Sequence, residues 1–137
     1  MRPYQRKIIN WLTVLAWLGV IYYFSNQPDL ASPLEPIWDI VLRKIAHAAE
    51  YFVLTYLLNR AILGQGVARP SAAVVSVLLS IAYALTDEWH QGFIRGRVAS
   101  LWDIGVDSSG TLLMWLLLHY EHRSITTPSI RNIRTHL

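Results

Sequence analysis

The 137-residue chain contains no cysteine, which excludes a disulfide framework and any thiolate metal site. It also contains little charge: 15% of its residues are charged, whereas a soluble domain carries about a quarter. The net charge of +3 is modest, and its basic residues form no continuous stripe, so we expect no nucleic-acid partner. The hydrolase motifs G-x-S-x-G and H-E-x-x-H do not occur in the sequence, so a familiar nucleophile or zinc motif does not define a reaction.

Hydrophobic residues, in contrast, make up 53% of the chain, and they gather in four apolar segments. These segments lie at about 8–24, 41–63, 71–88 and 101–119, and a membrane span needs about 20 residues. A soluble four-helix bundle would need a polar face on each helix, which "LTVLAWLGVIYYF" and "AAVVSVLLSIAYAL" do not have. The sequence therefore predicts a single all-α domain: a polytopic membrane protein built as a bundle of four transmembrane helices.

The distribution of Lys and Arg predicts the orientation of these spans, because cytoplasmic loops are enriched in positive charge. The first loop, 25–36, has no Lys or Arg, whereas basic residues occur before the first span, in the second loop and in the tail 121–137. We therefore expect a cell-membrane protein with both termini in the cytoplasm and a mobile basic tail. The third loop, with Arg95 and Arg97, violates the rule, which suggests that these two arginines serve another purpose.

Several polar residues lie within the apolar segments, where ionisable groups are costly and are therefore functional candidates. Lys44, His47 and Tyr51 are spaced to share one helical face. The spacing of Ser100, Asp103, Asp107 and Gly110 likewise describes one face of the fourth span. In the predicted topology both faces start at the outer membrane surface. We expect them to form one outer polar pocket together with the third-loop residues Asp87, Glu88, His90, Gln91 and Arg97.

Individual members of this set also have plainer structural interpretations. Asp103 follows Ser100 in the pattern of a helix capping box, and Arg43 can extend its side chain to lipid headgroups. Glu50 can form a structural ion pair with Arg43 or Lys44, and Arg95 can face lipid phosphates. Asp107 and His47 are harder to explain in this way, because they lie deeper in their spans.

The stretches "RKIAHAAEYFVL" (43–54) and "DEWHQGFIRGRVASLWDIGVDSSGTLL" (87–113), with "FSNQP" after the first span, resemble the VanZ-like membrane proteins. The resemblance covers about residues 24–113. It implies functional roles for a set of matching positions: Lys44, His47, Tyr51, Glu88, Gln91, Arg97, Asp103 and Gly110. Asp87 and His90 match a subset of the family.

Three residues depart from the family pattern. Arg43 stands where an Asp is frequent, Arg95 replaces a Pro, and Asp107 stands where Asn is common. The last departure puts in doubt any role that requires a neutral amide at that position. The name-giving members are linked to low-level resistance to the glycopeptide teicoplanin, so the resemblance implies a function in the cell envelope without supplying a reaction.

The sequence leaves two functions open, and they differ in whether the protein chemically converts the molecule that it binds. In the first, the pocket binds and modifies an anionic lipid or lipid-linked envelope precursor. Lys44 and Arg97 then hold the anionic group, and His47 or His90 acts as the acid or base. Glu88, Asp103 or Asp107 orients that histidine, and Tyr51, Asp87 and Gln91 complete the ligand-binding set. In the second, the same pocket binds a lipid or lipoglycopeptide without turnover.

Two further interpretations compete with these. A divalent metal could be held by nitrogen and oxygen ligands drawn from five residues: His47, Glu50, Glu88, His90 and Asp107. The charged residues could also form purely structural ion pairs. The sequence itself names no cofactor.

Overall fold

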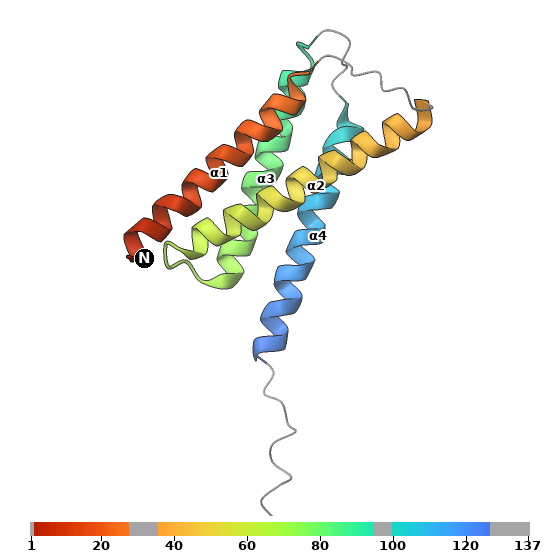
Figure 1. Ribbon diagram of the computed structural model, residues 1–137. Coiled ribbons are helices and arrows are strands. Elements are labelled where there is room, and N and C mark those ends of the chain that lie inside the picture. Colours follow the sequence, from red (N-terminus) through yellow and green to blue (C-terminus); the bar gives the residue numbers. More distant parts are fainter. Residues whose placement is uncertain (1, 28–35, 95–99, 127–137) are drawn as a thin grey trace, which may run out of the picture.

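The computed structural model describes residues 2–27, 36–94 and 100–126. These residues form four helices and, within the described ranges, no strand: α1 (Pro3–Ser25), α2 (Pro36–Leu63), α3 (Arg69–Gln91) and α4 (Leu101–Thr126). The chain therefore folds as an all-α bundle (Figure 1), and each of the four apolar segments expected from the sequence lies within one helix.

Proline and glycine account for several of the helix boundaries. Proline lies in the first turn of α1, α2 and α3, where its missing N–H has no partner to lose. Gly92 follows the last residue of α3. Between α2 and α3 the chain turns within a few residues, and Gly66 adopts a φ of 90° there, a conformation that residues with a Cβ rarely adopt.

Helix α2 lies at the centre of the bundle and packs against α1, α3 and α4. The C-terminal ends of α1 and α3 and the N-terminal ends of α2 and α4 lie at one end of the bundle (Figure 1), which we call the site end. The turn between α2 and α3 lies at the opposite end, near the N-terminus, and we call this the turn end. Neighbouring helices thus alternate in direction, and α2 and α4 run in the same direction.

The bundle has apolar side chains outside and many polar ones inside. Leu15, Leu78 and Leu116 are 61%, 61% and 55% exposed, whereas Thr55 and Ser80 are completely buried. Thr55 Oγ1 and Ser80 Oγ lie 2.9 Å apart in a hydrogen bond between α2 and α3. This distribution is typical of helices whose outer surface meets lipid and whose interface contains small and hydroxyl-bearing residues.

Two of the described helices, α1 and α3, are long and apolar enough to cross a membrane. Helices α2 and α4 are also long, at 28 and 26 residues, but they carry charged residues within their length. In α2 these include Asp39, Arg43, Lys44 and Glu50. These two helices provide Lys44, His47, Asp103 and Asp107 at the site end, and α3 adds Asp87, Glu88 and Gln91 at its C-terminal end.

Candidate functional site

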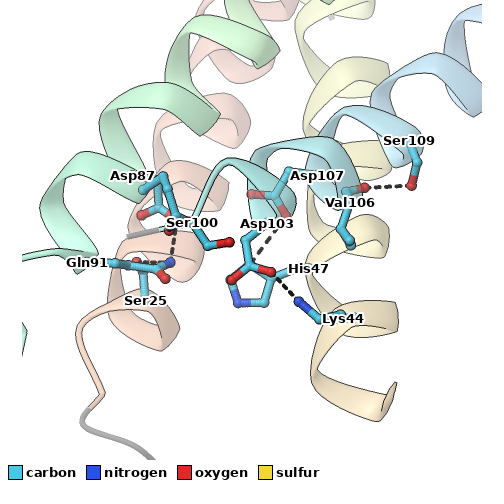
Figure 2. A network of polar contacts seen from close by, with 11 residues as sticks. Ser25, Lys44, His47, Asp87, Gln91, Ser100, Asp103, Val106, Asp107 and Ser109 are labelled. Atoms are coloured by element: carbon cyan, nitrogen blue, oxygen red, sulfur yellow. Dashed lines mark hydrogen bonds and ion pairs between the residues drawn. The ribbon is translucent and has the colours of Figure 1, made fainter. Parts of the chain in front are cut away.

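Lys44 of α2 and Asp103 of α4 form an ion pair between Nζ and Oδ1 near the start of both helices. The residues are 59 positions apart in the sequence, and their side chains are 34% and 37% exposed. Figure 2 shows the two side chains pointing toward each other. Asp103 therefore has a tertiary partner and is not only a helix-capping residue.

One turn deeper, His47 and Asp107 form a second pair between the same two helices. His47 Nδ1 lies 3.5 Å from Asp107 Oδ1, and the Asp107 side chain is 2% exposed whereas that of His47 is 19% exposed. Within the described residues, neither atom makes a hydrogen bond of good geometry. A buried carboxylate is costly without a partner, so the imidazole is the group that stabilises Asp107 at this position.

Tyr51 and Thr111 continue the same two faces, one turn beyond His47 and Asp107. Both side chains are completely buried, and neither hydroxyl has a hydrogen-bond partner among the described residues. Buried polar atoms are normally satisfied by protein or by an ordered water. Helices α2 and α4 thus direct four polar groups with unused bonding capacity into the bundle beneath the Lys44–Asp103 pair.

Helix α3 contributes two buried carboxylates at the site end. Asp87 Oδ2 accepts a hydrogen bond from Gln91 Nε2 at 3.0 Å, and the same amide donates to Ser25 Oγ of α1 at 2.8 Å. Glu88 Oε1 accepts the backbone N–H of Ser100 at 2.5 Å. Glu88 thus occupies the place that the capping-box interpretation gave to Asp103, since it bonds the Ser100 N–H. Ser100 Oγ does accept from Trp102 N at 3.2 Å.

His90 differs from His47 in its surroundings. Its Nε2 lies 3.3 Å from Asn26 Oδ1, and its ring stacks on Tyr22 with 5.2 Å between centroids. Tyr22 belongs to α1 and Asn26 caps its C-terminal end, and His90 is only partly buried. Of the two histidines considered from the sequence, His47 is therefore the one placed between α2 and α4 with a buried carboxylate.

The predicted convergence is visible in the described structure: α2, α3 and α4 bring Lys44, His47, Asp87, Gln91, Asp103 and Asp107 to one end of the bundle (Figure 2). Arg95 and Arg97 lie outside the described residues, so the predicted contacts of Arg97 remain predictions. Arg43, for which we weighed contact with headgroups, pairs with Asp39 one turn earlier on α2 at 2.5 Å.

The profile of the VanZ/LLP1 family matches residues 9–122. The chain belongs to the VanZ/LLP1 family. The matched region includes almost all of the four helices and every residue proposed for the site. VanZ proteins are membrane-associated, in agreement with the two helices that are apolar enough to span a bilayer. No curated protein and no solved structure matches the chain.

The structure of this VanZ protein also includes polar residues that the sequence analysis did not select. Ser25 and Asn26 reach the Gln91 and His90 side chains from the end of α1. Both residues belong to the "FSNQP" stretch, so a polar run directly after an apolar segment was the signal that could have revealed them. Thr111 had a weaker signal, its place four residues after Asp107 on the same helical face.

The divalent-metal interpretation receives no geometric support. Among the side chains that the structure describes, no three from His, Asp and Glu are gathered closely enough to hold a metal ion. His47 is directed to Asp107 and Glu88 is directed to the Ser100 backbone, while the His90 ring is held beside α1.

Proposed function

We propose that this VanZ protein is a multi-pass protein of the cell membrane with both termini in the cytoplasm, and that its site end meets the outer leaflet. The distribution of Lys and Arg supports this orientation. The alternating directions of α1 to α4 are the ones that four successive spans require. The exposed apolar side chains and buried polar ones support contact with lipid along the bundle.

We further propose that the site end binds and modifies an anionic lipid or a lipid-linked envelope precursor. The observation that carries this proposal is the placement of two polar pairs between α2 and α4: the Lys44–Asp103 ion pair near the surface and the His47–Asp107 pair one turn beneath it. Lys44, with Arg97 of the segment between α3 and α4, holds the anionic group. His47 transfers the proton, and Asp107 orients the imidazole for this step.

The charge balance of the described cluster determines how an anion can be held. Asp103 and Asp107 pair with Lys44 and His47, whereas the two carboxylates of α3, Asp87 and Glu88, are bonded to the Gln91 amide and to the Ser100 backbone N–H. An anionic headgroup therefore has to draw Lys44 away from Asp103. Because both side chains are about one-third exposed, this pair is worth about 1 kcal/mol or less, and a phosphate with two or more acceptor oxygens can replace Asp103 at little cost.

The second candidate function is binding of a lipid or lipoglycopeptide without turnover. It is favoured by the absence of a G-x-S-x-G or H-E-x-x-H motif from the sequence. It also agrees with the teicoplanin resistance of the name-giving members, since a bound glycopeptide or a shielded precursor would give such a phenotype without chemistry.

Turnover separates the two functions. The full-length protein, purified in detergent, is incubated with a lipid extract of the cell envelope, and mass spectrometry follows both the lipids consumed and the lipids that remain bound. The matched variants are His47→Gln, which removes the proposed acid or base, and Lys44→Met, which removes the proposed anion contact but keeps an unbranched side chain. Asp39→Asn removes the other ion pair at the start of α2 and serves as the control.

We expect the wild-type protein and Asp39→Asn to consume an anionic lipid, Lys44→Met to lose affinity for it, and His47→Gln to bind it without converting it. If an anionic lipid is bound in a way that depends on Lys44 but is consumed in no sample, the protein has the non-catalytic function. If no anionic lipid is consumed or retained, or if Lys44→Met retains it as well as the wild type, the proposed site is wrong.

A further inference from the structure

A cavity lies at the turn end of the bundle, on the opposite side of the protein from the proposed site. Its volume is about 290 Å³, and it is lined by the end of α2, the start of α3 and the second half of α4. Leu63, Val74 and Leu118 form part of its wall. The cavity is near the lower limit of ligand-sized pockets, about 300–1,000 Å³, so it can take part of a lipid whose remaining chain lies in the bilayer.

One buried amide in this cavity indicates what its ligand must offer. Asn59 lines the cavity, is 94% buried since only 6% of it is exposed, and its Oδ1 has no hydrogen-bond partner among the described residues. A buried acceptor without a partner costs about 1–3 kcal/mol. An occupant with a hydroxyl group would satisfy it, whereas a purely apolar occupant would not.

The rim of the same cavity carries charge. Arg69, the first residue of α3, lines the cavity and is exposed, and His119 lies at the other side with its ring stacked on Trp115 at 5.5 Å between centroids. Glu121 is the acidic residue of the rim. The neighbouring Arg60 is directed to α1, where it donates to Thr13 Oγ1 at 3.0 Å, so Arg69 is the guanidinium placed to meet an anion here.

We propose that this cavity binds an anionic glycerophospholipid whose headgroup carries free hydroxyls, with phosphatidylglycerol as the representative. The first part of an acyl chain lies against Leu63, Val74 and Leu118, and the phosphate meets Arg69 at the rim. A hydroxyl of the glycerol portion donates to Asn59 Oδ1. The apolar wall, the guanidinium and the buried amide of the cavity thus meet the acyl chain, the phosphate and the hydroxyl of one lipid. This site is separate from the one that contains His47 and Lys44.

The position in the membrane agrees with this ligand. The turn end is the end that the basic residues before the first span and in the second loop predict to be cytoplasmic, and anionic headgroups attract such residues. The cavity is open between helices whose outer faces are apolar, so a lipid can enter from the side without leaving the bilayer.

The test uses the full-length protein in bilayer discs that contain equal parts of phosphatidylcholine, phosphatidylethanolamine and phosphatidylglycerol. Native mass spectrometry counts the lipids that stay bound to the protein after the protein is released from the discs. Arg69→Ala removes the phosphate contact, Asn59→Leu removes the hydroxyl acceptor, and Ala73→Phe fills the cavity without changing a polar group. Arg6→Ala is the matched control, since it removes an exposed arginine of α1 that does not line the cavity. Gel filtration and helical circular dichroism select the folded variants.

We expect the wild type and Arg6→Ala to retain phosphatidylglycerol over the two other lipids. Arg69→Ala and Asn59→Leu should each reduce that preference about tenfold, the loss typical of one charge-assisted or buried hydrogen bond, and Ala73→Phe should reduce it by occupying the space of the lipid. Equal retention of the three lipids by the wild type would overturn the proposal, as would an unchanged preference in every folded cavity variant. Displacement by the deacylated headgroup alone, glycerophosphoglycerol, would also overturn it, because the site would then recognise a free phosphate ester and not a lipid.

Discussion

Gly110 of α4 lies directly against the backbone carbonyl of Ala48 in α2. A methyl group at Gly110 would overlap the carbonyl oxygen and would lie 2.7 Å from the carbonyl carbon. A small residue on the polar face of α4 allows this close approach of the two backbones. It fixes the spacing of the two parallel helices at the level where Lys44 pairs with Asp103 and His47 pairs with Asp107.

Gly110→Ala is therefore expected to separate α2 from α4 and to lower the free energy of unfolding by about 1–3 kcal/mol, the usual cost of overpacking. Thermal unfolding in detergent measures the change. Gly105→Ala in the same helix is the control, because a methyl group there meets no atom within 4 Å. Equal stability of Gly110→Ala and Gly105→Ala would mean that the close contact does not hold the helices together.

Exchanging the residues of the Lys44–Asp103 pair distinguishes its contribution to stability from its contribution to lipid binding. The double variant Lys44→Asp/Asp103→Lys keeps opposite charges together. We therefore expect its free energy of unfolding to lie within about 1 kcal/mol of the wild-type value. Lipid binding should nevertheless fall, because the cation then projects from α4 instead of α2. The two single variants, each measured for unfolding and lipid binding, complete the comparison. Wild-type binding by the reversed pair would show that the position of Lys44 is not important.

Asp107 tests the role of a buried carboxylate at a position where VanZ-like proteins often have Asn. Asp107→Asn should leave the protein folded and preserve much of its activity, since the amide keeps an acceptor oxygen facing His47. Asp107→Leu is the matched change of similar size that removes the acceptor, and it should lower activity much further. Activity is followed as lipid conversion by mass spectrometry. Complete loss in well-folded Asp107→Asn would show that the negative charge itself is needed.

The natural chain lacks cysteine, so single cysteines report the membrane orientation without background. Leu101→Cys, at an 87% exposed position at the site end, should react with a membrane-impermeant maleimide in intact cells. Gln65→Cys, exposed in the turn between α2 and α3, should react only after the cells are opened. Labelling is read by gel shift, and the reverse pattern would place the site end in the cytoplasm.

The four helices could be predicted because each contains a long apolar run, but their full lengths could not. Helix α2 begins at Pro36, before the apolar segment at 41, and α4 continues past His119 to Thr126. The reason is that both helices continue past a charged residue, Asp39 at the start of α2 and Glu121 near the end of α4, where hydropathy alone places the end of a span. Charged residues such as Asp39 and Arg43, which pair one turn apart, stabilise the helix outside the apolar part.

The sequence predicted which helical faces carry the site residues, but not which residues of those faces contact each other. The spacing of Lys44 and His47 on one helix and Asp103 and Asp107 on another identifies which sides are polar. Which groups meet depends on how far the helices are shifted along each other, and this is set by contacts such as Gly110 with Ala48.

The contribution of α1 had almost no signal in the sequence, because its apolar run contains no charged residue. Trp17 Nε1 donates to the backbone oxygen of Glu50 at 2.9 Å, and Ser25 accepts from Gln91. Both contacts join α1 to a helix that carries site residues, and they become evident only once the helices are packed.

The most direct test of the functional role of the site end is the teicoplanin concentration that inhibits cells whose only VanZ protein is the wild type, His47→Gln or Asp39→Asn. If the pair of His47 with Asp107 is the functional centre, the wild type and Asp39→Asn raise this concentration above that of cells carrying the empty vector. His47→Gln, present in the membrane at the same amount, gives the value of the empty vector. Equal protection by His47→Gln and the wild type, or no protection by the wild type, would contradict this account.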